Sequence, residues 1–199
     1  MKLFPNNRSL AGYTLVEVLG VLAVIVILAG ITFGTVAGIQ SARMKSIAKA
    51  EIALITQSLS SFYTKYGDYP ITKGEENNAV TLSKALLGWK VFQGNPVQMV
   101  DRKNVPPEGV TSFIDLSKIL YKGNLPLLET LIPNNVQFID PWGQPYVYAY
   151  KETKEWDNFS FVLYSKGPDQ SHMELEANGV LSTSYKNLDK NIDNIYLED

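Results

Sequence analysis

Hydrophobic residues dominate the N-terminal part of the chain. Residues 18–39 carry no formal charge and consist mainly of Val, Ile, Leu, Ala and Gly. The apolar core of a bilayer is about 30 Å thick, and a helix that rises about 1.5 Å per residue crosses it with about 20 residues. The pattern therefore predicts a transmembrane helix, which we place at residues 13–39.

The apolar pattern continues past this run with a helical period. Apolar side chains recur at steps of three, four or eight with polar residues between them, which is typical of an amphipathic helix: Met44, Ile47, Ile55, Leu59, Phe62 and Tyr66. A Gly-Asp-Tyr-Pro stop signal follows at residues 67–70. We predict one helix over residues 13–66, with an amphipathic second part (40–69) that packs on a globular head (70–199).

The first half of the head combines short helices with a loop. Residues 81–89 have a Thr suited to an N-cap and apolar spacing suited to a short helix. Residues 112–120 are a weaker candidate for a second helix. Residues 93–109 are rich in turn-forming residues and predict a loop.

The second half of the head contains segments typical of β-strands. Residues 144–152 and 158–167 alternate in polarity or are rich in aromatic residues, and the polar segment between them suits a hairpin. One more short strand is expected around residues 179–185. A long helix that covers a small antiparallel sheet is an α+β arrangement, which is the fold class we expect.

Composition narrows the range of functions. The chain has 199 residues, which leaves room for one modest folded domain beside a membrane segment. The net charge is -2 with Lys and Arg scattered, so no nucleic-acid partner is expected. The absence of Cys excludes disulfides and thiolate chemistry. The single His, His172, lies in a polar segment where we expect it to be solvated, and no nucleotide-binding or hydrolase motif is present, so no enzyme activity is expected.

One charge interrupts the apolar N-terminal region. Glu17 is the only charged residue between Leu10 and Ile39. A charge inside a membrane helix costs about 3 kcal/mol on insertion scales and is usually paired or functional. By its position alone, Glu17 either reaches the lipid headgroups or has a specific partner.

The residues before the helix contain a candidate processing site. Lys2 and Arg8 favour a cytoplasmic N-terminus and an exported head. A secretory signal has its small-residue cleavage site after the apolar run, whereas Ala11-Gly12 lies before it. Cleavage after Gly12 would leave the apolar helix on the mature protein and create an amine at Tyr13, about one helical turn from Glu17.

The basic leader is followed by Gly12, by the stretch Tyr13-Thr-Leu-Val-Glu17 and by the long apolar helix. This order resembles the signal of type IV prepilins and of the pseudopilins of type II secretion systems, although the family usually has Phe where this chain has Tyr13. The resemblance implies that prepilin peptidase removes a cytoplasmic leader, residues 1–12, and methylates the amine of Tyr13. It also implies that Glu17 pairs with the amine of a neighbouring subunit during assembly.

Two motifs in the head extend the resemblance. The chain has FIDPWGQPYVYAY at residues 138–150 and LYSKGPDQ at residues 163–170. They look like the D-P-W-G-x-P-Y and S-x-G-x-D elements of the major type II secretion pseudopilin, which implies a pilin-like fold. The residue types of the first motif favour a structural role: a turn shaped by Pro141 and Gly143, a core contact from Trp142 and capping of backbone N–H groups by Asp140.

The second motif is a candidate metal site. In major pseudopilins the loop after the last hairpin holds Ca²⁺, and the resemblance implies Asp169 and Asp193 as ligands, with Asp189 as a further candidate. Calcium takes six to eight oxygen ligands, which a turn and a returning tail can supply. The family's short Gly-rich link is replaced here by the longer segment 171–190. The alternative, in which these acidic residues are only solvated, therefore stays open.

The resemblance as a whole implies a structural protein. The chain would be a single-pass protein of the inner membrane with its head in the periplasm, and it would polymerise into the periplasmic pseudopilus of a type II secretion system. Its partners would be further copies of itself, other pseudopilins, prepilin peptidase and the inner-membrane secretion platform. Two alternatives stay open: a minor pilin of a type IV pilus or DNA-uptake machine, and a membrane-tethered periplasmic domain that binds a ligand or catalyses a reaction.

Overall fold

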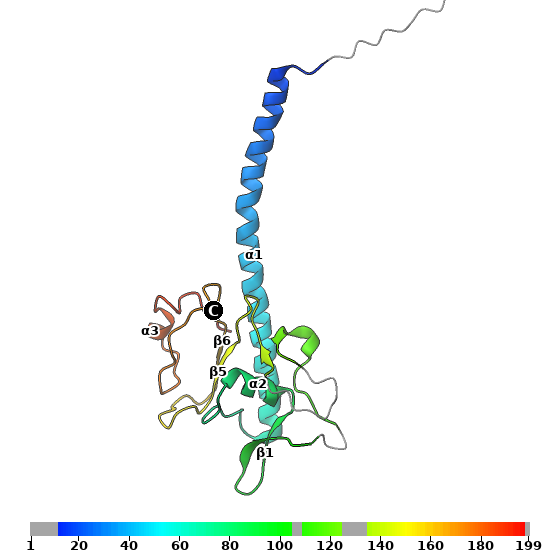
Figure 1. The fold of residues 1–199 in the computed structure, drawn as a ribbon. Coiled ribbons are helices and arrows are strands. Elements are labelled where there is room, and N and C mark those ends of the chain that lie inside the picture. Colours follow the sequence, from blue (N-terminus) through cyan, green and yellow to red (C-terminus); the bar gives the residue numbers. More distant parts are fainter. Residues whose placement is uncertain (1–11, 105–108, 125–134, 198–199) are drawn as a thin grey trace, which may run out of the picture. The chain divides into compact units, whose positions relative to one another are not determined.

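The structure is a computed structural model that describes residues 12–104, 109–124 and 135–197; within its first helix the side chains of residues 31–37 are not described. The chain divides into two compact units, Met1–Ala42 and Arg43–Asp199. Figure 1 shows the order of their elements along the sequence. Apart from Gly12, the predicted leader lies outside the described residues.

Helix α1 runs from Leu15 to Tyr66 (52 residues) and confirms the predicted long N-terminal helix, although it starts two residues later than predicted. It ends at Gly67, which has a left-handed backbone conformation with φ 80° and donates its N–H to the Tyr63 carbonyl at 2.7 Å. In the first unit, the apolar side chains from Val18 to Leu28 are exposed. Among the residues that the structure describes, no helix has the length and apolar character needed to cross a membrane.

The part of α1 in the second unit buries one face. Five side chains at steps of four, three, four and three residues have no exposed surface: Ala48, Ile52, Ile55, Leu59 and Phe62. The predicted stripe is confirmed at Ile55, Leu59 and Phe62, and Met44 and Tyr66 are half-buried. It is wrong at Ile47, which is 37% exposed and whose place Ala48 takes. Alanine contributes little to a hydrophobic pattern, whereas in the fold its small side chain lets the head pack close to the helix.

Helix α2 covers Asn78–Leu86, so it starts three residues before the predicted Thr81. Its N-cap is Asn77, whose side-chain oxygen accepts the N–H of Val80 at 3.1 Å. The hydroxyl of Thr81 donates instead to Glu75 at 3.2 Å. The prediction that Thr81 is the N-cap is therefore wrong, because Asn77 supplies an equally good cap about one turn earlier.

Among the described residues, the strands form three antiparallel pairs in place of the single sheet that we predicted. The pairs are β1 (Lys90–Gln93) with β2 (Gln98–Asp101), β3 (Tyr121–Lys122) with β4 (Gln137–Phe138), and β5 (Val147–Ala149) with β6 (Val162–Tyr164). The predicted hairpin of residues 144–167 is confirmed, with shorter strands. The architecture is α+β, with an N-terminal helix and small antiparallel sheets.

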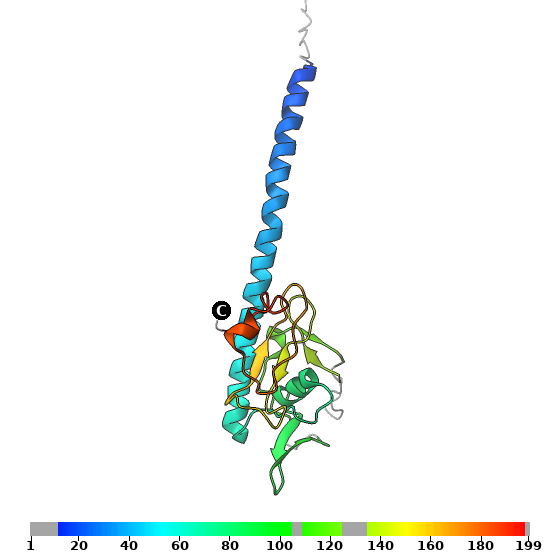
Figure 2. The same cartoon turned by 90° about the vertical axis from the view of Figure 1, so that its left-hand side faces the viewer.

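The predicted loop at residues 93–109 is wrong in its first part, because β2 follows a tight turn and pairs Gln98 with Gln93. The turn residues Gly94, Asn95 and Pro96 indicate a chain reversal, but they also suit the connection of a hairpin. Figure 2 shows this hairpin, in green, extending past the C-terminal end of α1.

Two further elements differ from the prediction. Residues 112–120 contain only a short 3-10 helix, η1 at Leu116–Lys118. The strand expected around residues 179–185 is absent from this described segment, which leads into helix α3 at Thr183–Lys186. Ser182 caps α3 by accepting the N–H of Tyr185 at 3.1 Å, and the Tyr185 side chain is buried. This cap and the burial of one ring outweigh the strand preference of Thr and Tyr.

Candidate functional site

The predicted processing site lies in exposed chain before α1. The side chain of Tyr13 is 88% exposed. Among the residues that the structure describes, none outside its chain neighbours has an atom within 4 Å of a Cβ built at Gly12. The peptide bond between these two residues is therefore open to a peptidase.

Glu17 belongs to a capping box at the start of α1. Its Oε2 accepts two hydrogen bonds from Thr14, one from the backbone N–H at 2.8 Å and one from the hydroxyl at 2.9 Å. In return the N–H of Glu17 donates to the Thr14 Oγ1 at 3.3 Å. The role of Thr14 is absent from our sequence-based prediction, although the T-x-x-E spacing of Thr14 and Glu17 is a recognised signal for it. Among the described residues no hydrogen bond reaches Oε1 of Glu17.

Asp140 organises the turn of the first head motif. Its side chain has no exposed surface, and its Oδ1 accepts the N–H groups of Trp142 at 3.0 Å and Gln144 at 2.9 Å. Gly143 follows Pro141 with φ 87°, a conformation that favours Gly, and donates its N–H to the Asp140 carbonyl at 2.9 Å. Trp142 is partly buried against the main core. The predicted capping and turn-forming contacts of this motif are thus present in the structure.

The second oxygen of Asp140 joins this turn to the second head motif. Oδ2 accepts the hydroxyl of Ser165 at 2.6 Å, and the Ser165 Oγ in turn accepts the N–H of Gly167 at 3.1 Å. Ser165 also exchanges two backbone hydrogen bonds with Ile195, at 3.1 and 2.9 Å. One buried carboxylate therefore connects two turns and the C-terminal tail.

The structure brings Asp169 and Asp193 together. The N–H of Asp169 donates to Oδ2 of Asp193 at 3.1 Å. Gly167 has φ 71°, and a Cβ there would lie 2.2 Å from the Asp193 carbonyl oxygen, so only Gly fits against the tail. Asp189 is exposed and, within this described region, forms no hydrogen bond or ion pair with either residue.

The geometry fits a hard cation in part. Within the described part of the chain, Oδ1 of Asp193 is buried without a hydrogen-bond partner, and so is Oδ1 of the next residue, Asn194. Unpaired buried oxygens are costly unless a donor or a cation reaches them. Among the described residues no three His, Cys, Asp or Glu side chains are grouped to hold a metal. A calcium ion here would rely on Asp193, with Asp169 close by, and on backbone or water oxygens for the rest.

Glu51 is a second buried carboxylate close to this region. It lies on α1 and is 6% exposed, and its Oε2 accepts the Tyr146 hydroxyl at 2.5 Å. Burial raises the pKa of Glu51, and the negative charge of Asp140 adds to the effect. Burial and the bond to Glu51 also raise the pKa of the Tyr146 hydroxyl.

We expect Glu51 to make the stability of the head depend on pH. Because its pKa is raised above the ordinary 4.5, the folded state retains a proton that the unfolded state has lost. Its favourable contribution is complete below about pH 4.5 and is lost as pH rises through the raised value. In urea unfolding followed by tryptophan fluorescence, Glu51→Gln should become increasingly more stable than the native chain between pH 4 and 7. A difference between Glu51→Gln and the native chain that stays constant with pH would contradict the prediction.

His172 is not the solvated side chain that we predicted. Its Nδ1 lies 2.7 Å from the Tyr164 hydroxyl, which lies 3.1 Å from the Tyr185 hydroxyl. The Tyr185 hydroxyl donates to the Met173 carbonyl at 2.7 Å, so one consistent proton order has Nδ1–H of His172 donating to Tyr164 and Tyr164 donating to Tyr185. Burial and the nearby Lys166 lower the pKa of His172. This chain of bonds holds part of segment 171–190 against β6.

Comparison of the chain with models of known protein families, with curated proteins and with solved structures yields no match.

Proposed function

We propose that this chain is a structural subunit of a pseudopilus. It is stored in the inner membrane through residues 13–39 with its head in the periplasm, is cleaved between Gly12 and Tyr13 and methylated on the new amine, and then polymerises in a type II secretion system. The observation that carries the proposal is Glu17, the only charge in the apolar N-terminal region, held at the first turn of α1 next to an exposed cleavage site.

The exposed apolar part of α1 supports storage in lipid and later burial among neighbours. In the part of the chain that the structure describes, the apolar side chains from Val18 to Leu28 are exposed. An apolar surface of this length, without charge, marks a site that lipid or protein covers. A membrane and then a filament core would cover it in turn. The α+β architecture with a long N-terminal helix is compatible with a pilin-like fold.

The capping box gives Glu17 two roles that do not compete. Thr14 occupies Oε2, so the carboxylate is fixed at the helix terminus in the single chain. Oε1 is left for the charged amine of Tyr13 in a neighbouring subunit. An ion pair in an apolar environment is strong when its geometry is fixed and weakly screened by salt. Thr14 would therefore position the carboxylate for assembly.

Calcium would stabilise the head in this proposal. The chain has no Cys, so the tail cannot be held by a disulfide. A divalent cation would neutralise the unpaired Asp193 carboxylate oxygen and join the tail to the turn that carries Asp169.

N-terminal processing tests the proposed function. When the chain is produced together with a prepilin peptidase, Edman sequencing and intact mass should show a mature protein that begins with N-methylated Tyr13. Gly12→Val should block cleavage, because a branched side chain replaces the only residue without a Cβ at the site, whereas Gly38→Val should be cleaved normally. A protein that keeps Met1, or is released after Gly38 or Ala42, would exclude a prepilin.

Calcium binding is tested by thermal unfolding of the full chain in detergent. At a calcium concentration about 100 times the Kd, binding adds about 2.7 kcal/mol, which raises the Tm by about 5–10 °C for a head of this size. Asp193→Asn should abolish the shift, and Asp189→Asn should retain it. An unchanged Tm on adding EGTA or calcium would contradict the metal site.

A further inference from the structure

One turn near the C-terminus exposes two aliphatic side chains, and we call residues 188–193 the Ile192 turn. Ile192 is 73% exposed and Leu188 is 42% exposed, and Asp189 and Lys190 between them are exposed as well. Single exposed aliphatic side chains are common on protein surfaces, so they indicate a partner only where the local structure and the position support one. Both support one for this turn.

A buried amide holds the Ile192 turn in place. The side chain of Asn191 is 1% exposed; it donates to the Tyr185 carbonyl at 2.8 Å and accepts the N–H of Met173 at 2.8 Å. The backbone N–H of Asn191 donates to the Leu188 carbonyl at 2.7 Å. This anchor keeps the adjacent Ile192 at the surface, so burying its side chain requires a partner outside the chain.

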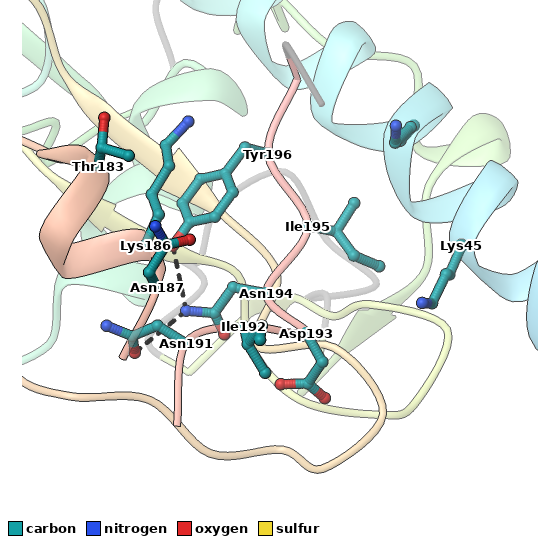
Figure 3. Close-up of a pocket in the computed structure, with 11 residues that line it drawn as sticks. Lys45, Thr183, Lys186, Asn187, Asn191, Ile192, Asp193, Asn194, Ile195 and Tyr196 are labelled. Carbon is teal, nitrogen blue, oxygen red and sulfur yellow. Dashed lines mark hydrogen bonds between the residues drawn. The ribbon is translucent and has the colours of Figure 1, made fainter. Parts of the chain in front are cut away.

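The Ile192 turn lies beside the first residues of α1 in the unit of residues 43–199. Ile192, Lys45 and Lys49 line one cavity of about 470 Å³. Figure 3 shows this cavity, with Lys45 on α1 on one side and Ile192 and Asp193 on the other. The exposed aliphatic pair is therefore close to the part of α1 that follows the apolar run.

The proposed membrane segment sets the depth of this part of α1 in a bilayer. Lys45 follows Ile39, the last residue of the uncharged run, by six residues. A helix advances about 1.5 Å per residue, so six residues span about 9 Å. The headgroup layer is about 5–8 Å thick on each side of the apolar core. With residues 13–39 in the membrane, the Ile192 turn would lie at the outer boundary of the headgroups, and the average tilt of about 20° brings one side of the head closer still.

We propose that the Ile192 turn inserts the side chains of Leu188 and Ile192 into the headgroup layer of the membrane that stores the chain. The inference rests on the proposed function, because it takes residues 13–39 as the membrane segment. Lipid is the partner because the turn lies next to the helix that continues directly into that segment. Helix and turn together would fix the rotation of the head about α1 before assembly.

The aliphatic side chains, and not charge, carry the contact. Lys45 and Lys190 can extend their ammonium groups to lipid phosphates, as basic side chains near a membrane do. Asp189 offsets the charge of Lys190 within the turn. Insertion of an apolar surface scales with the area that it buries and is insensitive to salt, so we expect the contact to persist at high ionic strength.

Fluorescence quenching tests this contact, because the native chain has no Cys and a single label can be attached. Full-length Ile192→Cys carries an environment-sensitive fluorophore and is placed in nanodiscs with nitroxide-labelled lipid. Val97→Cys is the matched control, since Val97 is 69% exposed and belongs to the hairpin that extends past the C-terminal end of α1 (Figure 2). We expect the lipid nitroxide to quench the label at residue 192 at least about threefold more than the control, and aqueous iodide to quench it less. Equal quenching of the two labels would overturn the contact.

The number of copies in each nanodisc separates lipid from protein as the partner. The quenching of the label at residue 192 by lipid should be the same with one copy and with several. Protection from iodide that is absent with one copy, without quenching by lipid, would show that a second copy covers the turn and would overturn the proposal.

A charge at residue 192 provides a second readout. With the label on Leu188→Cys, the added substitution Ile192→Glu should lower quenching by lipid at least about threefold, because a carboxylate disfavours insertion. Val97→Glu should leave this quenching unchanged. Circular dichroism checks that the variants are folded, which we expect because both substituted side chains are largely exposed. Unchanged quenching in Ile192→Glu would overturn the role of this side chain.

The outcomes separate this contact from the proposed function. Quenching by lipid at residue 192 in an inserted chain that is never processed would keep the contact and remove the pseudopilus. Processing at Tyr13 and filament formation, with both labels equally open to water, would remove the contact and leave the pseudopilus.

Discussion

Glu17→Ala is expected to abolish polymerisation while the head folds and the chain inserts in the membrane as before. The variant would leave the charged amine of the neighbouring Tyr13 without a partner in an apolar environment. An uncompensated charge in such an environment is strongly unfavourable, so we expect a loss of filaments by a factor of at least about 100. Insertion should not suffer, because the substitution removes a charge from the apolar run.

The measurement is the fraction of subunit in sheared filaments, collected by sedimentation from cells that contain the secretion machinery. Membrane fractionation and resistance of the head to protease report insertion and folding in the same cells. Filaments at the native level from Glu17→Ala would remove the central argument for the proposed function.

Two matched variants separate the charge of Glu17 from its capping role. Gln is accepted in a capping box, so Glu17→Gln keeps the bonds to Thr14 and loses only the charge. Thr14→Val keeps the charge and loses the hydroxyl that donates to Oε2 at 2.9 Å. We expect Glu17→Gln to be as defective as Glu17→Ala and Thr14→Val to be affected less. The reverse order would make the capping box, and not an ion pair, the function of this carboxylate.

Asp140→Ala is expected to destabilise the head more than any other single change among those described above. The substitution removes the acceptor of three donors: the N–H groups of Trp142 and Gln144 and the hydroxyl of Ser165. Asp140 has no exposed surface, so water reaches these donors only if the turn opens. A buried donor left without a partner costs about 1–3 kcal/mol, and three of them together should cost about 3–5 kcal/mol.

The free energy of unfolding of the full chain, from urea titration in detergent, measures this effect. Asp115→Ala is the matched control: Asp115 also accepts a backbone N–H and a hydroxyl, both from Ser117, but it is exposed. The control should lose much less stability, because water can replace the lost acceptor at an exposed turn. Ser165→Ala, which removes one of the three donors, should lie between the two. If Asp140→Ala is no worse than Asp115→Ala, the turn is not a stability determinant.

The coupling between Asp140 and the tail connects this prediction with the candidate metal site. Ser165 bonds both to Asp140 and, through its backbone, to Ile195, two residues after Asp193. Opening the turn in Asp140→Ala should therefore also displace the tail. A calcium-dependent shift of the Tm should then become smaller in this variant, even though neither Asp169 nor Asp193 is changed.

The sequence by itself determined the elements that depend on neighbours a few residues apart. The period of apolar residues after residue 40 and the Gly67–Pro70 stop are local signals, and they place the end of α1 at Tyr66, as in the structure. The β5–β6 hairpin follows in the same way from strand-like segments around a polar connection. The turn of Asp140 to Gly143 also needs only the residue types that favour it.

Only the tertiary structure decided which face of α1 is buried and which polar atoms are paired. Ala48 and Ile52 belong to the buried stripe because the head packs on them. The periodicity of α1 alone does not predict this contact. Residues 179–185 begin a helix and not a strand because the Tyr185 ring is buried and bonded to Tyr164, 21 residues away in sequence. Hydrophobic patterns act along the chain, whereas the pairing of buried groups depends on contacts across it.

In the candidate site too, the local contacts can be predicted from the sequence and the long-range contacts cannot. The T-x-x-E spacing of Thr14 and Glu17 is readable in the sequence, since both ends of the capping box lie in one helical turn. The contact between Asp169 and Asp193, and the unpaired Oδ1 of Asp193, cannot be predicted from the sequence. The two residues are separated by 23 others, and they approach each other only because Gly167 packs closely against the tail. Local spacing specifies the capping box of Thr14 and Glu17, whereas the packing of distant segments specifies the contact between Asp169 and Asp193.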